Sequence, residues 1–471
     1  MRSVLQRRLV GPDLSRWLTG LIIMGLLAAV VFLGRQPSIG LLALPVLVLG
    51  GAALLWRPSL GLLGLVLAAL LIPIQLDTGT EVMLNPAALL VPVLLAVWLV
   101  DAVRQGRITL TASRTNKPLL LFLLAGLLSL LAGNALWDPA VPRPGNMTMV
   151  QIAQWAILAF SAGAFWLAAN LLPDERWLQR LTWTYLILGG VPAIMSRVPG
   201  LAPLMTPFIT IAYSRAPMWA LMAAVAGGQL AFNPDLSTGR RLYLVIVLGI
   251  VVSVIFGSQR DSISTWIGVL AVAGVLFWLR FPKLRIATIV LIVLLSGIVF
   301  AFLWEFWGGE ARWDESGGSR LVLTERVVSV AMRNPITGLG PASYRPYAGS
   351  EPLMYLGAYW VDPQISSHNN YADLFAHVGL LGMGLLAWFF WKLGRLAHRL
   401  GSTLEPGFAS GYVHGMLALL AGSLVIMIFA DWILPFVYNI GFPGFQASVL
   451  VWLFWGGLVV IEQQMHQGAS S

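Results

Sequence analysis

Two arginines and one histidine stand immediately before long apolar runs, at Arg215, Arg260 and His368. A guanidinium offers a planar set of donors that suits phosphate oxygens, and it keeps its charge at neutral pH. An imidazole can take up a proton near neutral pH. These residue types suit the binding of a diphosphate and the transfer of a proton near neutral pH.

Each of these residues also has a purely structural explanation. An arginine at the end of an apolar helix can place its charge among lipid headgroups, and Arg260 can pair with its neighbour Asp261. An isolated histidine in a loop is more often structural than catalytic. The loops that hold Arg215 and Arg260 contain no lysine, which favours specific recognition by arginine over a general excess of positive charge.

The composition places the chain in a lipid bilayer. Of its 471 residues, 58% are hydrophobic and 10% are charged, too few charges for a water-facing protein of this length. The net charge of +9 is typical of a membrane protein with basic cytoplasmic loops, so we expect no nucleic-acid partner. The absence of cysteine excludes disulfides, thiolate metal sites and cysteine nucleophiles.

The apolar runs predict an all-α polytopic membrane protein with about 12–14 transmembrane helices, because a span needs about 20 apolar residues. The first run follows several arginines and has no small-residue cleavage site, so we interpret it as a retained helix. The predicted spans are 17–34, 39–56, 59–75, 84–102, 118–133, 149–171, 178–195, 216–232, 241–257, 262–280, 284–306, 371–391, 409–431 and 443–461.

The basic residues predict the orientation of these spans. With the N-terminus inside, 19 of the 29 basic residues fall in cytoplasmic segments and five in short outer loops. Basic residues collect on the cytoplasmic side, so we expect both termini on the cytoplasmic side of the inner membrane and the loop 307–370 on its outer side. This divides the chain into helices at 1–306, a periplasmic loop at 307–370 and three helices at 371–471.

The long loop is predicted to be ordered. From Arg320 to Asn334, apolar pairs alternate with Arg326 and Arg333, as in an amphipathic helix that lies on the membrane or against the bundle. Pro335 ends that pattern. A connection of this length is usually functional or disordered, and the pattern favours function.

Three stretches in the C-terminal half resemble the O-antigen ligase and polymerase family. The first is Ser367-His368-Asn369-Asn370-Tyr371, which opens a helix and is followed by Gly379-Leu380-Leu381-Gly382. Gly318-Ser319-Arg320, leading to the segment 334–341 (Asn-Pro-Ile-Thr-Gly-Leu-Gly-Pro), is similar to that family's loop. Ser258-Gln259-Arg260 is similar to its Ser-x-Arg element.

The resemblance implies a GT-C-like fold and a metal-independent inverting glycosyltransferase that uses a polyprenyl-diphosphate-linked glycan. The family's catalytic histidine corresponds to His368, and its diphosphate-binding arginines to Arg260 and Arg215. Arg320 is a further candidate for the diphosphate, although it could instead pair with Glu325. One departure is His377, which stands where the family often has an acidic residue nine positions after the histidine.

Several residues are candidates for contact with the glycan or the acceptor. Aromatic side chains with a polar edge suit a sugar ring at a wet boundary, but membrane interfaces use the same residues. Asp431 could orient an acceptor or the histidine, or it could pair locally. The candidates are Asn369, Tyr344, Tyr347, Tyr359 and Asp431.

No cofactor or metal is expected, because the outer segments hold no Asp-x-Asp pattern and their one acidic pair, Asp314-Glu315, stands beside arginines. The expected partners are the lipid-linked donor, a glycan or glycolipid acceptor and the bilayer. A protein O-oligosaccharyltransferase of the same superfamily is an alternative. A transporter of lipid-linked oligosaccharide is another, but it would favour charges at mid-membrane, which the spans largely lack.

Overall fold

The computed structural model divides into two compact units, 1–61 and 62–471. It describes residues 57–468, apart from the gaps 78–81, 105, 107–109, 261, 287–288, 290–319, 352, 356–358 and 362–366. The predicted spans 17–34 and 39–56 lie outside the described residues, as does most of 284–306. All the described helices and strands belong to the second unit, except that the first helix, Ser59–Leu71, begins in the first.

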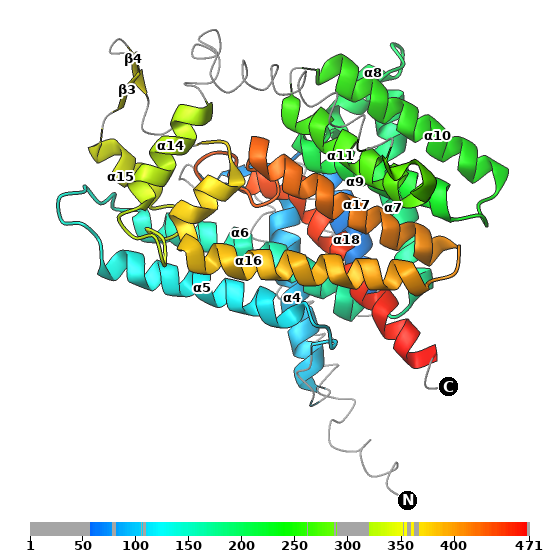
Figure 1. Cartoon of the computed structure of the whole chain (residues 1–471), viewed down its shortest axis with the longest axis horizontal. Coiled ribbons are helices and arrows are strands. Elements are labelled where there is room, and N and C mark those ends of the chain that lie inside the picture. The colour runs from blue at the N-terminus through cyan, green and yellow to red at the C-terminus, as the bar shows by residue number, and fades with distance from the viewer. Residues whose placement is uncertain are drawn as a thin grey trace, which may run out of the picture. The chain divides into compact units, whose positions relative to one another are not determined.

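The described residues are almost entirely helical (Figure 1). The helices before the long loop are α3 Ser59–Leu71, α4 Pro86–Arg104, α5 Asn116–Ala135, α6 Met147–Leu171, α7 Glu175–Met195, α8 Ala202–Met205, α9 Ala216–Phe232, α10 Thr238–Ser253 and α11 Ile263–Arg280. Those within and after it are α14 Arg320–Ala331, α15 Tyr344–Ser350, α16 Asn370–Thr403, α17 Phe408–Phe429 and α18 Gly441–Gly468. Two small antiparallel hairpins join β1 Leu76–Asp77 to β2 Met83–Leu84, and β3 Leu353–Tyr355 to β4 Tyr359–Val361.

Eight of these helices are long and apolar enough to cross a membrane, which confirms the all-helical polytopic membrane fold. They are α4, α5, α6, α10 with its continuation to Ser258, α11, α16, α17 and α18. The predicted spans 59–75 and 216–232 form the shorter apolar helices α3 and α9. The predicted span 178–195 lies in α7, whose first turn is charged and is capped by Asp174 through a 2.9 Å bond from Trp177 N–H.

Helix α18 is the centre of the bundle, because its whole membrane-length window is buried. Trp452 stacks on Phe389 of α16 with ring centroids 5.7 Å apart. Gly456 lies so close to α6 that a Cβ there would overlap the carbonyl oxygen of Phe165. A central helix with such close neighbours gives the loop before its N-terminal end a rigid support.

Helix α16 is broken near Gly379, whose φ of 62° is left-handed. The segment 334–341 fills the break. Leu339 N–H donates to Ala376 O at 2.8 Å, and Leu380 N–H donates to Pro335 O at 2.9 Å. A Cβ on Gly379 would overlap the carbonyl oxygen of Ile336, so this close approach of two backbones requires glycine. The motif's glycines therefore join the long loop to the interrupted helix.

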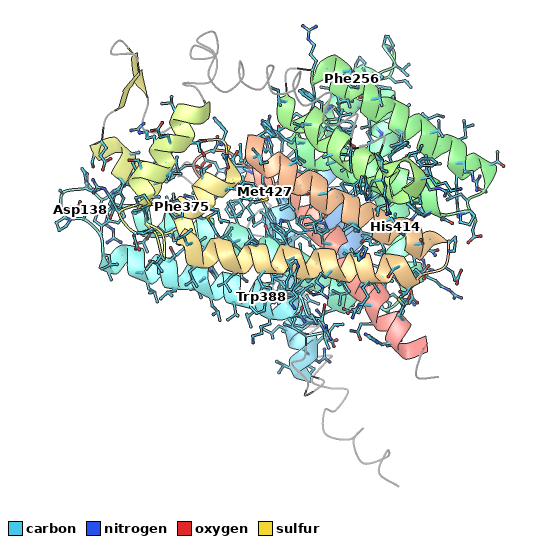
Figure 2. All side chains as sticks on the ribbon, in the orientation of Figure 1. Asp138, Phe256, Phe375, Trp388, His414 and Met427 are labelled. Atoms are coloured by element: carbon cyan, nitrogen blue, oxygen red, sulfur yellow. The ribbon has the colours of Figure 1, made fainter. Side chains whose placement is uncertain are left out.

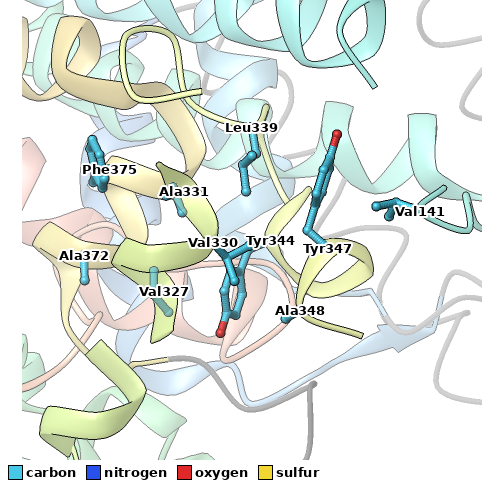
Figure 3. Close-up of a cluster of buried hydrophobic side chains, with 11 residues drawn as sticks. Val141, Val327, Val330, Ala331, Leu339, Tyr344, Tyr347, Ala348, Ala372 and Phe375 are labelled. Carbon is cyan, nitrogen blue, oxygen red and sulfur yellow. The ribbon is translucent and has the colours of Figure 1, made fainter. Parts of the chain in front are cut away.

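Helices α14 and α15 pack beside the first part of α16 (Figure 1). The predicted amphipathic helix is confirmed, although α14 ends at Ala331 rather than Asn334. It buries Leu323, Val327 and Val330 and exposes Glu325. Its buried face belongs to a cluster with α15 and α16 (Figure 3), so the described part of the loop is a folded part of the protein.

Candidate functional site

His368 is presented by a short turn just before α16, and its polar neighbours in the motif support that turn. His368 has a left-handed φ of 52°. Asn369 caps α16 by accepting from Tyr371 N–H at 2.9 Å. Ser367 donates to Asp373 Oδ1 at 2.8 Å and accepts from Asn369 N–H at 3.1 Å. Asn369 therefore caps the helix, and the half-buried imidazole of His368 does not.

The loop 430–440, which joins α17 to α18, faces this turn. Asn370 holds it with two bonds, one to Leu434 O at 2.8 Å and one from Leu434 N–H at 3.3 Å. The buried Gln154 of α6 binds it through Pro435 O at 3.2 Å and Val437 N–H at 2.6 Å. Both side chains are buried, so the loop has one well-defined path.

Asn439 connects His368 to Asp431. Its Nδ2 donates to Nδ1 of His368 at 3.0 Å and to Oδ2 of Asp431 at 2.7 Å. A carboxylate can only accept, so it requires the amide nitrogen rather than the amide oxygen at this position. The same nitrogen then meets the lone pair of Nδ1, and the neutral imidazole carries its proton on Nε2.

Arg215 approaches the same carboxylate from another helix. It is the N-cap residue of α9, and its guanidinium carbon lies 4.3 Å from the ring centre of Trp432. Burial lowers the pKa of the Arg215 guanidinium, and the negative charge of Asp431 opposes that shift. Its Nε is buried without a hydrogen-bond partner in the described part of the chain. Such an unpartnered donor next to an aromatic platform suits an incoming anion.

The Ser258-Gln259-Arg260 element lies beside the loop that holds Arg215. A π-helical turn, Val254–Ser258, follows α10, and Gln259 then donates from Nε2 to Tyr213 O at 2.8 Å. Arg197 donates to Ser258 Oγ at 2.7 Å. Arg260 itself is exposed. The structure thus joins this element to the loop of Arg215, and a role of Arg260 in binding diphosphate stays a prediction.

The remaining candidates fall into two groups. Tyr344 and Tyr347 are only 5% and 3% exposed and lie in the cluster that α14, α15 and α16 share, with Tyr347 toward Val141 (Figure 3). Burial also raises the pKa of Tyr344. Contact of these two rings with a glycan stays a prediction, and it requires their exposure. Arg320 begins α14 and Tyr359 lies in β4, but their side chains are outside the described part of the structure.

Apart from Asp431, the residues of the 430–440 loop were not predicted from the sequence. Asn439 and Trp432 contact two predicted site residues, and Arg345 of α15 donates to Tyr438 O while lying 4.2 Å from the Tyr438 ring centre. In the sequence, these residues stand out only as polar and aromatic side chains between two predicted spans, and such a cluster is equally typical of a membrane interface.

An apolar groove begins one turn from His368. It encloses about 340 Å³ between α16 and α17 and is lined by Tyr371, Leu374, Met383, Leu386, Ala387, Phe390, Trp391 and Leu424. Figure 2 labels Met427 and His414 toward the two ends of α17, with Met427 toward the end of the bundle where Phe375 of α16 is labelled. The groove therefore leads from the site along the bundle, as an aliphatic chain attached to a bound headgroup would require.

The site combines an arginine, an imidazole and a carboxylate at one end of the bundle. No cluster of three or more metal-ligating side chains occurs among the residues that the structure describes. Residues 260–387 match the family model described as O-antigen ligase, which includes Arg260, Arg320 and His368. Among curated proteins, no match to the chain is found. The resemblance predicted from the sequence is confirmed over this segment, and the chain carries an O-antigen ligase domain at residues 260–387 within a helical, multi-pass membrane protein.

Proposed function

We propose that this protein is a membrane glycosyltransferase that moves a glycan from a polyprenyl-diphosphate carrier to a hydroxyl of a glycan or glycolipid. The match to the O-antigen ligase family implies a lipid-linked glycan as substrate. The supporting observation is the pair of hydrogen bonds that joins Asp431 through Asn439 to His368, together with the electrostatic interaction of Arg215 with Asp431. Positive-inside charge supports a site at the outer face of the inner membrane.

In this reaction the acceptor oxygen forms a bond to the anomeric carbon while the bond from that carbon to the diphosphate breaks. The diphosphate leaves with the electron pair, and Arg215, with Arg260 and Arg320 as further candidates, stabilises the charge that develops on it. The acceptor's proton passes to His368. Diphosphate is already a good leaving group, so the proposal needs neither a covalent intermediate nor a general acid.

The contact with Asn439 places a condition on this proton transfer. His368 can accept a proton at Nε2 only as the tautomer that carries its hydrogen on Nδ1. Nδ1 would then donate to the side-chain oxygen of Asn439, which requires a protonated Asp431 on the other side of that amide. A diphosphate that binds Arg215 favours this change, because it withdraws from Asp431 the positive charge that stabilises its ionised form. Donor binding would thereby prepare the base.

The test uses the purified full-length chain in lipid nanodiscs with a defined polyprenyl-diphosphate oligosaccharide. Separate reactions contain a lipid A core, a second lipid-linked repeat and a serine-containing peptide, and mass spectrometry identifies the product. Transfer to the first acceptor indicates a ligase and to the second a polymerase. Transfer to the peptide alone would favour the protein O-oligosaccharyltransferase. No product with any acceptor, together with retained donor binding, would favour a transporter.

The matched variants are His368→Ala and His466→Ala, the latter an exposed histidine near the end of α18. We expect His368→Ala to lower transfer about 10²- to 10⁴-fold with donor binding retained, and His466→Ala to have no effect. Equal transfer by the two variants would remove His368 from the mechanism. We also expect EDTA to leave transfer unchanged, since a metal is not part of the proposed reaction.

A further inference from the structure

A further cavity, lined mainly by polar and charged residues, lies at the end of α16 opposite His368. It encloses about 220 Å³ and is lined by residues before α5, in the last turns of α16 and near the end of α18: Ser113, Arg114, Thr115, Lys392, Arg395, Leu396, His398, Arg399 and Glu462. Twenty residues of continuous helix separate Gly379 from Arg399, which corresponds to about 30 Å, and His368 lies beyond the break at Gly379. This cavity therefore takes no part in the chemistry proposed for His368.

Positive charge dominates the lining. Arg114, Lys392, Arg395 and Arg399 are cationic, and Glu462 is the one carboxylate among the lining residues. The pair between Arg399 and Glu462 neutralises one of these charges. The cavity keeps an excess of positive charge that a phosphate group would balance.

Glu462 adds a second, independent feature. The residue is 5% exposed, and while Oε1 pairs with Arg399, Oε2 is buried without a hydrogen-bond partner in the described part of the chain. A buried carboxylate oxygen without a donor is costly unless a ligand or water supplies one. A hydroxyl on the same molecule as the phosphate would satisfy it.

The residues beside the cavity suit a lipid headgroup. Lys392 Nζ and the Arg395 guanidinium carbon lie 4.8 Å and 5.2 Å from the ring centre of Trp391, which is 53% exposed. Tryptophan with lysine and arginine is typical of the membrane–water boundary, and basic pockets between helices bind anionic headgroups.

We propose that this cavity binds a phosphate-bearing ligand that also carries a hydroxyl group, with a glycerol-type anionic phospholipid as the membrane source of that chemistry. Arg114, Lys392 and Arg395 contact the phosphate, and Glu462 Oε2 accepts from the hydroxyl. The site is distinct from the proposed transferase site and stands whether or not transfer is observed.

The test measures binding of short-chain phosphatidylglycerol, phosphatidylcholine of the same chain length, and glycerol phosphate to the purified full-length chain in detergent. Lys392→Ala/Arg395→Ala removes two lining charges. Arg104→Ala/Lys283→Ala removes two exposed charges outside the cavity and is the matched control. We expect phosphatidylglycerol to bind more tightly than phosphatidylcholine, and the first double variant to weaken it about thirtyfold, with no change in the control.

Binding of glycerol phosphate with the same sensitivity to Lys392→Ala/Arg395→Ala would extend the site to soluble ligands. Glu462→Gln should reduce the preference for phosphatidylglycerol over short-chain phosphatidic acid, which has no headgroup hydroxyl. The proposal is overturned if phosphatidylglycerol and phosphatidylcholine bind equally, or if both double variants bind phosphatidylglycerol as the unmodified chain does.

Discussion

Asn439 lies 71 residues from His368 in the sequence, yet its side-chain nitrogen is 3.0 Å from Nδ1 of that histidine. The same nitrogen also bonds Asp431. The loop between α17 and α18 thereby decides which tautomer of the imidazole is present, while the His368 motif itself supplies the turn and the cap of α16. Changes at Asn439 should consequently alter proton transfer without disturbing the motif.

We expect Asn439→Leu to lower the rate of transfer about 10²-fold with donor affinity nearly unchanged, because Nδ1 loses its partner and the ring its fixed orientation. Asn439→Asp should retain more activity, since the introduced carboxyl group, which shares one proton with Asp431, accepts from Nδ1–H and favours the tautomer that a base needs. Single-turnover kinetics with a separate measurement of donor binding would show both effects. Equal rates for the two variants would exclude the tautomer argument.

Replacement of Arg215 by lysine keeps the charge but removes the planar guanidinium that lies over Trp432. We expect Arg215→Lys to weaken binding of the polyprenyl-diphosphate donor about tenfold or more, because lysine cannot offer two parallel donors to phosphate oxygens. Arg143→Lys is the control, since Arg143 lies over Trp137 at 5.4 Å but away from the site. If both substitutions weaken binding of the donor to the same extent, stacking on tryptophan rather than phosphate recognition explains the effect of Arg215→Lys.

The break in α16 predicts different outcomes for two glycines of one helix. Gly379→Ala would place a Cβ against Ile336 O at a left-handed φ, and we expect a loss of about 2 kcal/mol or more of stability. Gly384 has open space around its Cβ position. Gly384→Ala should be neutral or stabilise by up to about 1 kcal/mol. Thermal unfolding in detergent compares the two, and similar melting temperatures would contradict the close contact between the segment 334–341 and α16.

Arg326 should hold α15 in place. It is 6% exposed and donates to Ala348 O at 2.7 Å and to Glu351 O at 2.9 Å. We expect Arg326→Met to raise amide hydrogen exchange across 344–351 at least about tenfold, because two carbonyls lose a buried donor.

Arg333→Met serves as the comparison for Arg326→Met. The side chains of Arg333 and Asp138, which form an ion pair, are both more than one-third exposed. We therefore expect Arg333→Met to raise amide exchange less than Arg326→Met does, and this smaller increase should vanish at high salt. Unchanged exchange in Arg326→Met would show that α15 stays in place without this side chain.

The sequence was sufficient to predict features that depend on local patterns. Apolar runs located the long helices, and the cap at Asn369 agrees with a helix that opens at the His368 motif. Alternation of apolar pairs located α14, whose end differs by three residues because the turn that leads to Pro335 begins early. The strands β3 and β4 have only three residues each, too few for a periodic pattern, and they were not predicted.

The arrangement of the candidate site was only partly predictable. Arg215 and His368 could be selected because each residue type suits the chemistry and each stands before an apolar run. Asn439 could not, because no pattern in the sequence says which polar residue of a distant loop will face the imidazole. Tyr344 and Tyr347 suggested a surface role by their type, yet their neighbours in α14 and α16 bury both of them.

The interruption at Gly379 separates α16 into two pieces that pack with different partners. The nine residues from Asn370 to Val378 contribute to the cluster with α14 and α15, whereas the longer piece packs against α17 and α18. The segment 334–341 bonds both pieces, through Ala376 O before the break and through the N–H groups of Leu380 and Leu381 after it. His368 directly precedes the shorter piece. Asn370 at the start of the shorter piece also bonds Leu434 in the loop that carries Asp431. A tilt of the shorter piece would therefore move the imidazole and this loop together, which keeps the contact from His368 through Asn439 to Asp431.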